Sequence, residues 1–162
     1  MTKKDVIISI RGRQFFLDLN DDEPMELVTS GELSHSGGGY ILTYREHGLP
    51  GMDDTITTLM IDLERITLLR SGSISTQMVF EEGRKHLSFY DTDEGALLIG
   101  VQAKKVRAVM NDFGGDIEME YLVEIDHAVS GANQVSITVK EAGGKKPPEP
   151  QYYGIVHDGF IN

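Results

Sequence analysis

The chain has 162 residues, enough for one domain with a substantial core and too few for two domains of ordinary size. Apolar residues make up 40% of it, as in globular proteins, and the formal net charge of −11 argues against nucleic acids and anionic membranes as partners, because both bind basic surfaces. The absence of cysteine excludes disulfides, zinc–thiolate sites and cysteine nucleophiles.

The start of the chain has no pattern of a targeting segment. Only the five residues 6–10 form an apolar-rich stretch before Arg11, and this is too short for the apolar part of a signal peptide. No stretch approaches the roughly 18 apolar residues that cross a membrane as a helix. We therefore expect a cytoplasmic protein that has no membrane partner.

Apolar and polar residues alternate with a period of two along most of the chain, and helical periodicity is nearly absent. The first expected strand carries Val6, Ile8 and Ile10 on one face. Further strands are expected at residues 27–33, 40–45, 55–63, 66–70, 77–81, 87–91 and 97–110. The alternation is clearest at 117–126 and 135–140, where only one face of each strand is apolar, as in an antiparallel sheet with one wet side.

Glycine-containing turns separate these strands, at residues 37–39, 71–73, 82–84, 93–95, 113–115 and 130–132. Glycine supplies the positive φ that tight hairpins require. The spacing of strands and turns predicts an all-β, antiparallel, closed or nearly closed barrel of about nine or ten strands.

One expected strand changes phase in its middle. The apolar residues before Lys104-Lys105 occupy odd positions, and those after it occupy even positions. A β-bulge there would return both sets to one face and bend the strand, as closure of a barrel requires. A short helix over residues 103–110 is the alternative.

Two regions fall outside the barrel pattern. Residues 13–25 are expected to form a long connection, apolar at its start and acidic at its end. Residues 1–142 are assigned to the barrel domain and residues 143–162 to an extended, Pro/Gly-rich C-terminal tail, because its prolines cannot join a sheet interior. The apolar end of the tail is expected to dock on the barrel, to contact a neighbouring chain or to be disordered.

An ordered series of residues along the predicted barrel is similar to a known family. The series is Ile10-Arg11-Gly12 with Gln14, Glu26-Leu27 with Thr29 and Gly31, Tyr40, Tyr44-Arg45-Glu46, Gly51, Arg70-Ser71-Gly72, Phe80 with Gly83, Tyr90-Asp91-Thr92 with Gly95, Gly114-Gly115, Tyr121, Asn133 and Ile137. Over roughly residues 5–142 it resembles the YwiB-like family of small bacterial proteins, domain-of-unknown-function family 1934. The resemblance implies a lipocalin-like (calycin) β-barrel and a cytoplasmic protein of a Gram-positive-type bacterium, and it implies no known activity.

No motif for catalysis, a metal or a cofactor stands out. The five histidines lack metal-ligand spacing, and the residues from Asp91 to Gly95 lack the later ligands of a calcium loop. Adjacent carboxylates such as Asp53 and Asp54 would point to opposite faces of a strand. We therefore expect a protein that is not an enzyme and that holds neither a metal nor a cofactor.

A small barrel can enclose one ligand cavity, which is mostly apolar with a few polar groups. The candidate ligand-binding residues are tyrosines and charges on otherwise apolar strands: Tyr40, Tyr44, Glu46, Arg70, Tyr90 and Tyr121. They would hold the carboxylate or phosphate of a small amphipathic ligand, with Glu46 as the partner of an inward Arg70. The competing interpretation is a structural ion pair with tyrosines closing a filled core. In that case the protein is a non-catalytic structural or interaction module that acts through its surface, its tail or a homodimer interface.

Overall fold

The computed structural model describes residues 3–16, 19–22, 25–46, 55–72, 75–92, 95–142 and 151–155. All regular elements within these residues are β-strands. They are β1 (Lys3–Phe16), β2 (Leu19–Asp22), β3 (Met25–Ser36), β4 (Gly39–Glu46), β5 (Thr55–Ile61), β6 (Arg65–Ser71), β7 (Thr76–Glu81), β8 (Lys85–Thr92), β9 (Gly95–Asn111), β10 (Gly114–Ile125), β11 (Ala128–Glu141) and β12 (Gln151–Ile155). The described residues include no helix that is long and apolar enough to span a membrane.

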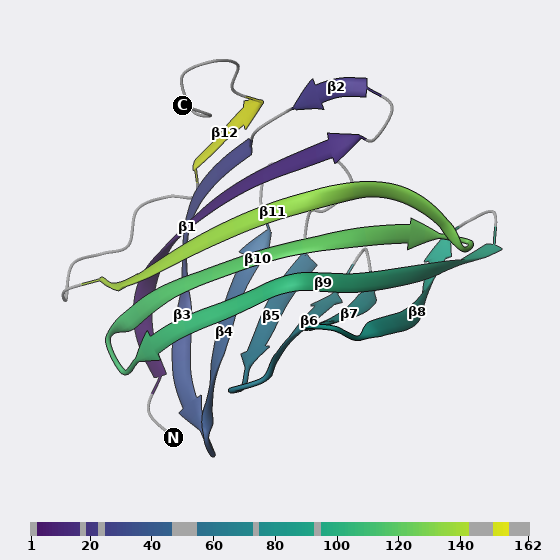
Figure 1. Cartoon of the computed structure of the whole chain (residues 1–162). Coiled ribbons are helices and arrows are strands. Elements are labelled where there is room, and N and C mark those ends of the chain that lie inside the picture. Colours follow the sequence, from purple (N-terminus) through teal and green to yellow (C-terminus); the bar gives the residue numbers. More distant parts are fainter. Residues whose placement is uncertain are drawn as a thin grey trace.

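All twelve strands belong to one antiparallel sheet, and ten of them form a continuous path in the order β7-β6-β5-β4-β3-β1-β11-β10-β9-β8, with β2 paired to β1 and β12 paired to β3. The sheet curls so that the wall of β1, β11, β10 and β9 faces the wall of β4 to β7, as Figure 1 shows. β1 pairs with β3 on one side and with β11 on the other, so it joins the half of the sheet from β3 to β7 to the half from β8 to β11. The predicted all-β, antiparallel, nearly closed barrel is confirmed.

The region predicted as a long connection is largely strand, so that prediction is wrong for the described part of residues 13–25. β1 continues to Phe16, and its residue Phe15 pairs with Ala132 of β11. β2 then turns back onto β1, and β3 begins at Met25. The alternation of apolar residues stops at Gly12, although the main chain continues to pair beyond it, and this is why the sequence pattern ended too early.

Part of the predicted tail also joins the sheet. β12 pairs with β3 along Met25–Val28, beyond the point where β4 stops pairing with β3. It lies near β2 at the upper end of the barrel in Figure 1. This segment therefore docks on the barrel and covers an edge that would otherwise present unpaired main-chain groups.

The bend predicted at Lys104-Lys105 is present. Lys105 pairs with Glu120 and Ala103 pairs with Tyr121, so Lys104 is the extra residue of a β-bulge. The bulge returns the apolar residues on both sides of it to the inner face of the barrel, and β9 runs unbroken for 17 residues. The bulge is confirmed over the alternative of a short helix.

A packed hydrophobic core occupies the middle of the barrel between its two walls. Alternate residues of neighbouring strands point inward and meet in layers, which removes them from water. The most deeply buried of them include Val6, Ile8, Leu42, Leu59, Ile66, Phe80, Ile117 and Val101. This core lies next to the cavity described below, and Leu59 and Phe80 belong to both.

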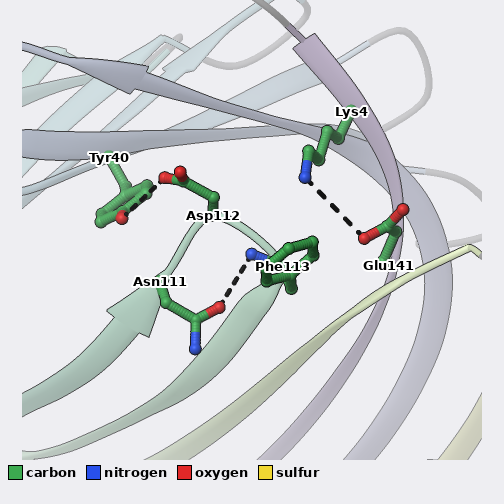
Figure 2. A network of polar contacts seen from close by, with 6 residues as sticks. All are labelled: Lys4, Tyr40, Asn111, Asp112, Phe113 and Glu141. Carbon is green, nitrogen blue, oxygen red and sulfur yellow. Dashed lines mark hydrogen bonds and ion pairs between the residues drawn. The ribbon is translucent and has the colours of Figure 1, made fainter.

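At the lower end of the barrel, polar contacts join β4 and β1 to the turn between β9 and β10, as Figure 2 shows. The hydroxyl of Tyr40 on β4 donates a hydrogen bond of 3.0 Å to Oδ1 of Asp112, in the turn between β9 and β10. Lys4 of β1 lies over the ring of Phe113 at 4.1 Å from its centroid and 3.8 Å from the carboxylate of Glu141. Each contact is exposed and individually weak, but together they tie β4, β1 and the β9–β10 turn across the barrel end.

The barrel has a seam between β7 and β8, because no continuous ladder joins these two strands among the described residues. The seam is fastened near its turn by isolated bridges that join Glu81 to Arg84 and Glu82 to Ala103. Nε2 of His86 also lies 3.0 Å from Oε1 of Glu81. This hydrogen bond is the main cause that lowers the pKa of Glu81 below its ordinary value.

The Glu81 contact predicts a pH-dependent contribution to stability. A carboxyl whose pKa is lowered by folding stabilises the protein above its unfolded pKa, and this contribution is lost as the pH falls through the lower, folded value. In urea unfolding, Glu81→Gln is therefore expected to be less stable than the wild type at pH 7, and the difference should vanish at an acidic pH below the lowered pKa of Glu81. The control is Glu64→Gln, in the exposed β5–β6 turn. A constant difference at both pH values would contradict the prediction.

Candidate functional site

A cavity of about 240 Å³ that is partly open to solvent lies toward the end of the barrel opposite the Tyr40–Asp112 contact. It extends from the second half of β1 and the start of β3 on one wall to the ends of β4 and β6 on the other. Its described lining consists of Ile10, Gly12, Arg13, Met25, Tyr44, Leu59, Leu68, Arg70, Phe80, Met119, Tyr121, Asn133, Gln134, Val135 and Ile137. Most of the lining is apolar, with a minority of hydrogen-bonding side chains.

Strand register explains how polar residues gather on one side of the cavity. Tyr44 of β4 lies opposite Thr57 of β5, and Thr57 lies opposite Arg70 of β6. The three residues therefore form one row across three strands and face the same side of the sheet. The next inward row toward the barrel centre contains Leu59 and Leu68, which are apolar. The polar row thus forms the rim of an apolar interior.

Tyr121 of β10 approaches the same space from the opposite wall. Its ring packs against Phe80 in an edge-to-face contact, with ring centroids 4.7 Å apart at an interplanar angle of 63°. Burial raises the pKa of the Tyr121 phenol, and the positive charge of Arg70 acts in the opposite sense. The phenol is therefore neutral near pH 7 and can donate a hydrogen bond into the cavity.

The cavity brings together three of the six candidate residues named from the sequence: Tyr44, Arg70 and Tyr121. Tyr40 lies at the lower end of the barrel, where it stacks on His35 with ring centroids 4.9 Å apart. Tyr90 of β8 packs against the core and does not line the cavity as described. The described lining therefore includes neither Tyr40 nor Tyr90, and a role of either residue in ligand binding stays a prediction.

The sixth candidate, Glu46, ends β4 opposite Thr55, and its side chain lies outside the described residues. Its pairing with Arg70 stays a prediction. The sequence interpretation also missed polar lining residues, among them Arg13 and Asn133. Asn133 shares the alternation of Val135 and Ile137, so its inward position could have been inferred from that pattern. Arg13 gave no such signal, because it was placed in a connection.

The described residues contain no group of three or more histidine, aspartate or glutamate side chains that could hold a metal ion. The chemistry of the described site is instead that of hydrogen-bond donors and apolar walls. A guanidinium has five N–H donors and no acceptor, and a phenol can donate one hydrogen bond. The site can therefore hold a molecule that presents an acceptor group beside an apolar body.

A nearly closed antiparallel barrel of ten strands, with a partly polar cavity toward one end, fits a lipocalin-like (calycin) barrel. The chain belongs to the family described as Domain of unknown function (DUF1934), whose model matches residues 8–137. The resemblance inferred from the sequence is thereby confirmed.

The fold is also similar to a solved structure, the crystal structure of ywiB protein from Bacillus subtilis. The TM-score is 0.76 at 16% sequence identity, and the match covers 86% of this chain and 93% of that chain. At this identity the likeness establishes the fold alone. A search of the curated proteins finds no significant match.

Proposed function

We propose that the protein is a non-catalytic binding protein that holds a small, partly apolar ligand inside the barrel. The observation that carries the proposal is the convergence of Arg70, Tyr44 and Tyr121 on one apolar-walled cavity from three different strands. A few convergent polar groups in an apolar cavity are typical of small-molecule sites, where they fix the orientation of the ligand.

The size of the cavity limits the ligand. An apolar cavity of about 150 Å³ binds benzene, and pockets for drug-sized ligands have volumes of roughly 300–1,000 Å³. The cavity of about 240 Å³ lies between these values. It fits a compound with a single ring or a short chain and one polar substituent.

The donors of the cavity select the polar substituent. The side chains of Arg70 and Tyr121 both carry hydrogen-bond donors, and a carboxylate or a phosphate can accept several hydrogen bonds at once. The apolar part of the ligand would then contact side chains such as Leu59, Leu68 and Met119. The proposed ligand is therefore a small amphipathic compound with an acceptor, and preferably an anionic, head.

Native mass spectrometry of the purified protein tests the proposal directly. A co-purified compound of low mass, bound one per barrel, is the expected result.

The same spectrum reports the mass of the assembly, so it also tests the alternative function, an interaction module. The observation that favours this alternative is the exposure of Leu87 and Phe89, 56% and 68%, on the outer face of β8. A homodimer without any bound compound would support it over ligand binding.

Removal of the Arg70 head tests the role of the polar row. Arg70→Met keeps an unbranched apolar stem and removes the donors, so binding of benzoate or phenyl phosphate should weaken about 10-fold or more, equivalent to about 1.4 kcal/mol. Ligand-observed NMR titration measures the change. The matched control is Arg45→Met, because Arg45 is exposed on the outer face of the neighbouring strand β4. Equal weakening in both variants would show a nonspecific charge effect.

The proposed setting is the bacterial cytoplasm. It is supported by the similar protein from Bacillus subtilis and by a chain that has no cysteine and so needs no oxidising compartment to fold. Cell fractionation of the native host tests this part of the proposal independently of ligand binding.

A further inference from the structure

Glycine within a strand usually has a local reason. A positive φ or the close approach of another main-chain segment excludes a side chain at such a position. Gly114 has a φ of +137°, and an added Cβ would overlap the carbonyl oxygen of Val139. At Gly31, an added Cβ would lie 2.5 Å from the carbonyl oxygen of Thr43. Both glycines are required by the barrel itself.

Gly12 has neither of these reasons. It is absent from the residues of positive φ, and a Cβ built on it would meet its nearest neighbours, the carbonyl oxygen of Gln134 and Cε of Met25, only at 4.0 Å. It lies in β1 opposite Val135 and Met25, on the same face as the inward Ile10. The barrel therefore has room for a side chain at position 12, and this room belongs to the cavity.

Glycine at position 12 makes the protein less stable than a residue with an apolar side chain would. Glycine has the most freedom to lose on folding, and a β-branched residue in its place would gain strand propensity and buried apolar area. Gly12 thus leaves a volume unfilled that an apolar side chain could fill with a gain in the stability of the fold. Space left at a local cost in stability is expected where a ligand occupies it.

The two walls of the cavity give the orientation of this ligand. In the sheet order, β1 and β6 are separated by β3, β4 and β5 on one side and by five strands on the other, so they lie on facing walls. Gly12 is on the β1 wall and Arg70 is on the β6 wall. The guanidinium of Arg70 and the unfilled volume beside Gly12 are therefore at opposite sides of the same cavity.

We propose that Gly12 sets the size of the ligand: the apolar body of the ligand occupies the volume that a side chain at position 12 would fill, while its acceptor group lies at Arg70. This inference rests on the proposed function and adds to it a residue that determines specificity. The ligand class is a compound with a compact apolar body, such as one ring, directly attached to an acceptor head.

The test is the series Gly12→Ala, Gly12→Val and Gly12→Leu, with benzoate and xenon as probes. Benzoate reports the complete site, and xenon reports apolar volume without any polar requirement. Benzoate affinity and the xenon-induced NMR shifts are expected to fall as the side chain grows, with a loss of 10-fold or more for Gly12→Leu. The melting temperature is expected to stay constant or to rise by about 2–4 °C for Gly12→Val.

The control is Gly38→Ala in the β3–β4 turn, where no atom lies within 4 Å of an added Cβ. It should leave the binding of both probes unchanged. Unchanged benzoate binding in a folded Gly12→Leu variant would overturn the inference and leave the proposed function standing. Failure of the wild type to bind benzoate, together with the absence of any co-purified compound, would instead overturn the proposed function and the inference together. If Gly12→Leu does not fold, Gly12→Val decides in the same way.

Discussion

Gly114→Ala is expected to lower the free energy of unfolding by about 3 kcal/mol, because it combines backbone strain with overpacking. Gly114 begins β10 directly after the turn that contains Asp112 and Phe113, and its φ of +137° is one that residues with a Cβ rarely adopt. The added Cβ would also overlap the carbonyl oxygen of Val139, which is main chain and cannot rotate away as a side chain would. The two effects act on the same atom and cannot be relieved separately.

Urea unfolding and thermal melting measure this change, and the melting temperature should fall by about 6–12 °C. Gly12→Ala is the matched control, since it makes the same chemical change in a strand where the new Cβ meets no atom closer than 4.0 Å. It should be neutral or slightly stabilising. Equal losses in both variants would show that the cost does not depend on the φ value or on the contact with Val139, and the geometric distinction between the two glycines would then fail.

The same comparison shows what a sequence can predict about this fold. The phase change at Lys104-Lys105 predicts the bulge correctly, because side-chain direction in a strand depends only on counting residues. The glycines carry no such information. Gly12 and Gly114 are the same residue type in the sequence. Only the distance from an added Cβ to the neighbouring strand shows that Gly114 has no room for a side chain and that Gly12 has.

For the candidate site residues, the sequence predicted which face of the strand they occupy but not their position along the barrel. Tyr40 and Tyr44 share the inner face of β4, as their spacing predicted, but four residues of strand separate them by about 13 Å along the barrel. Tyr40 therefore contacts Asp112 at the lower end, and Tyr44 lines the cavity. Alternation gives the face of a residue and not its height, which depends on the register of all neighbouring strands. This is also why Tyr90 could not be separated from Tyr121 by pattern alone.

The aromatic contact beneath the cavity gives a second large expected effect. Phe80 is 1% exposed and is the largest fully buried side chain of the described residues. Its ring contacts Tyr121 edge-to-face and lines the cavity next to the core. Phe80→Ala removes the transfer energy of the ring and leaves a void, so the free energy of unfolding should fall by about 3–5 kcal/mol. Urea unfolding measures the loss.

Phe89→Ala provides the control, because Phe89 is 68% exposed on β8 and its loss should change stability by no more than about 0.5 kcal/mol. If Phe80→Ala is too unstable to isolate, Phe80→Leu keeps most of the volume and should cost less. In a folded Phe80 variant the void adjoins the cavity, so xenon should bind more tightly than in the wild type. Reduced xenon binding would mean that the barrel collapses into the space, and the cavity would then depend on the ring that supports it.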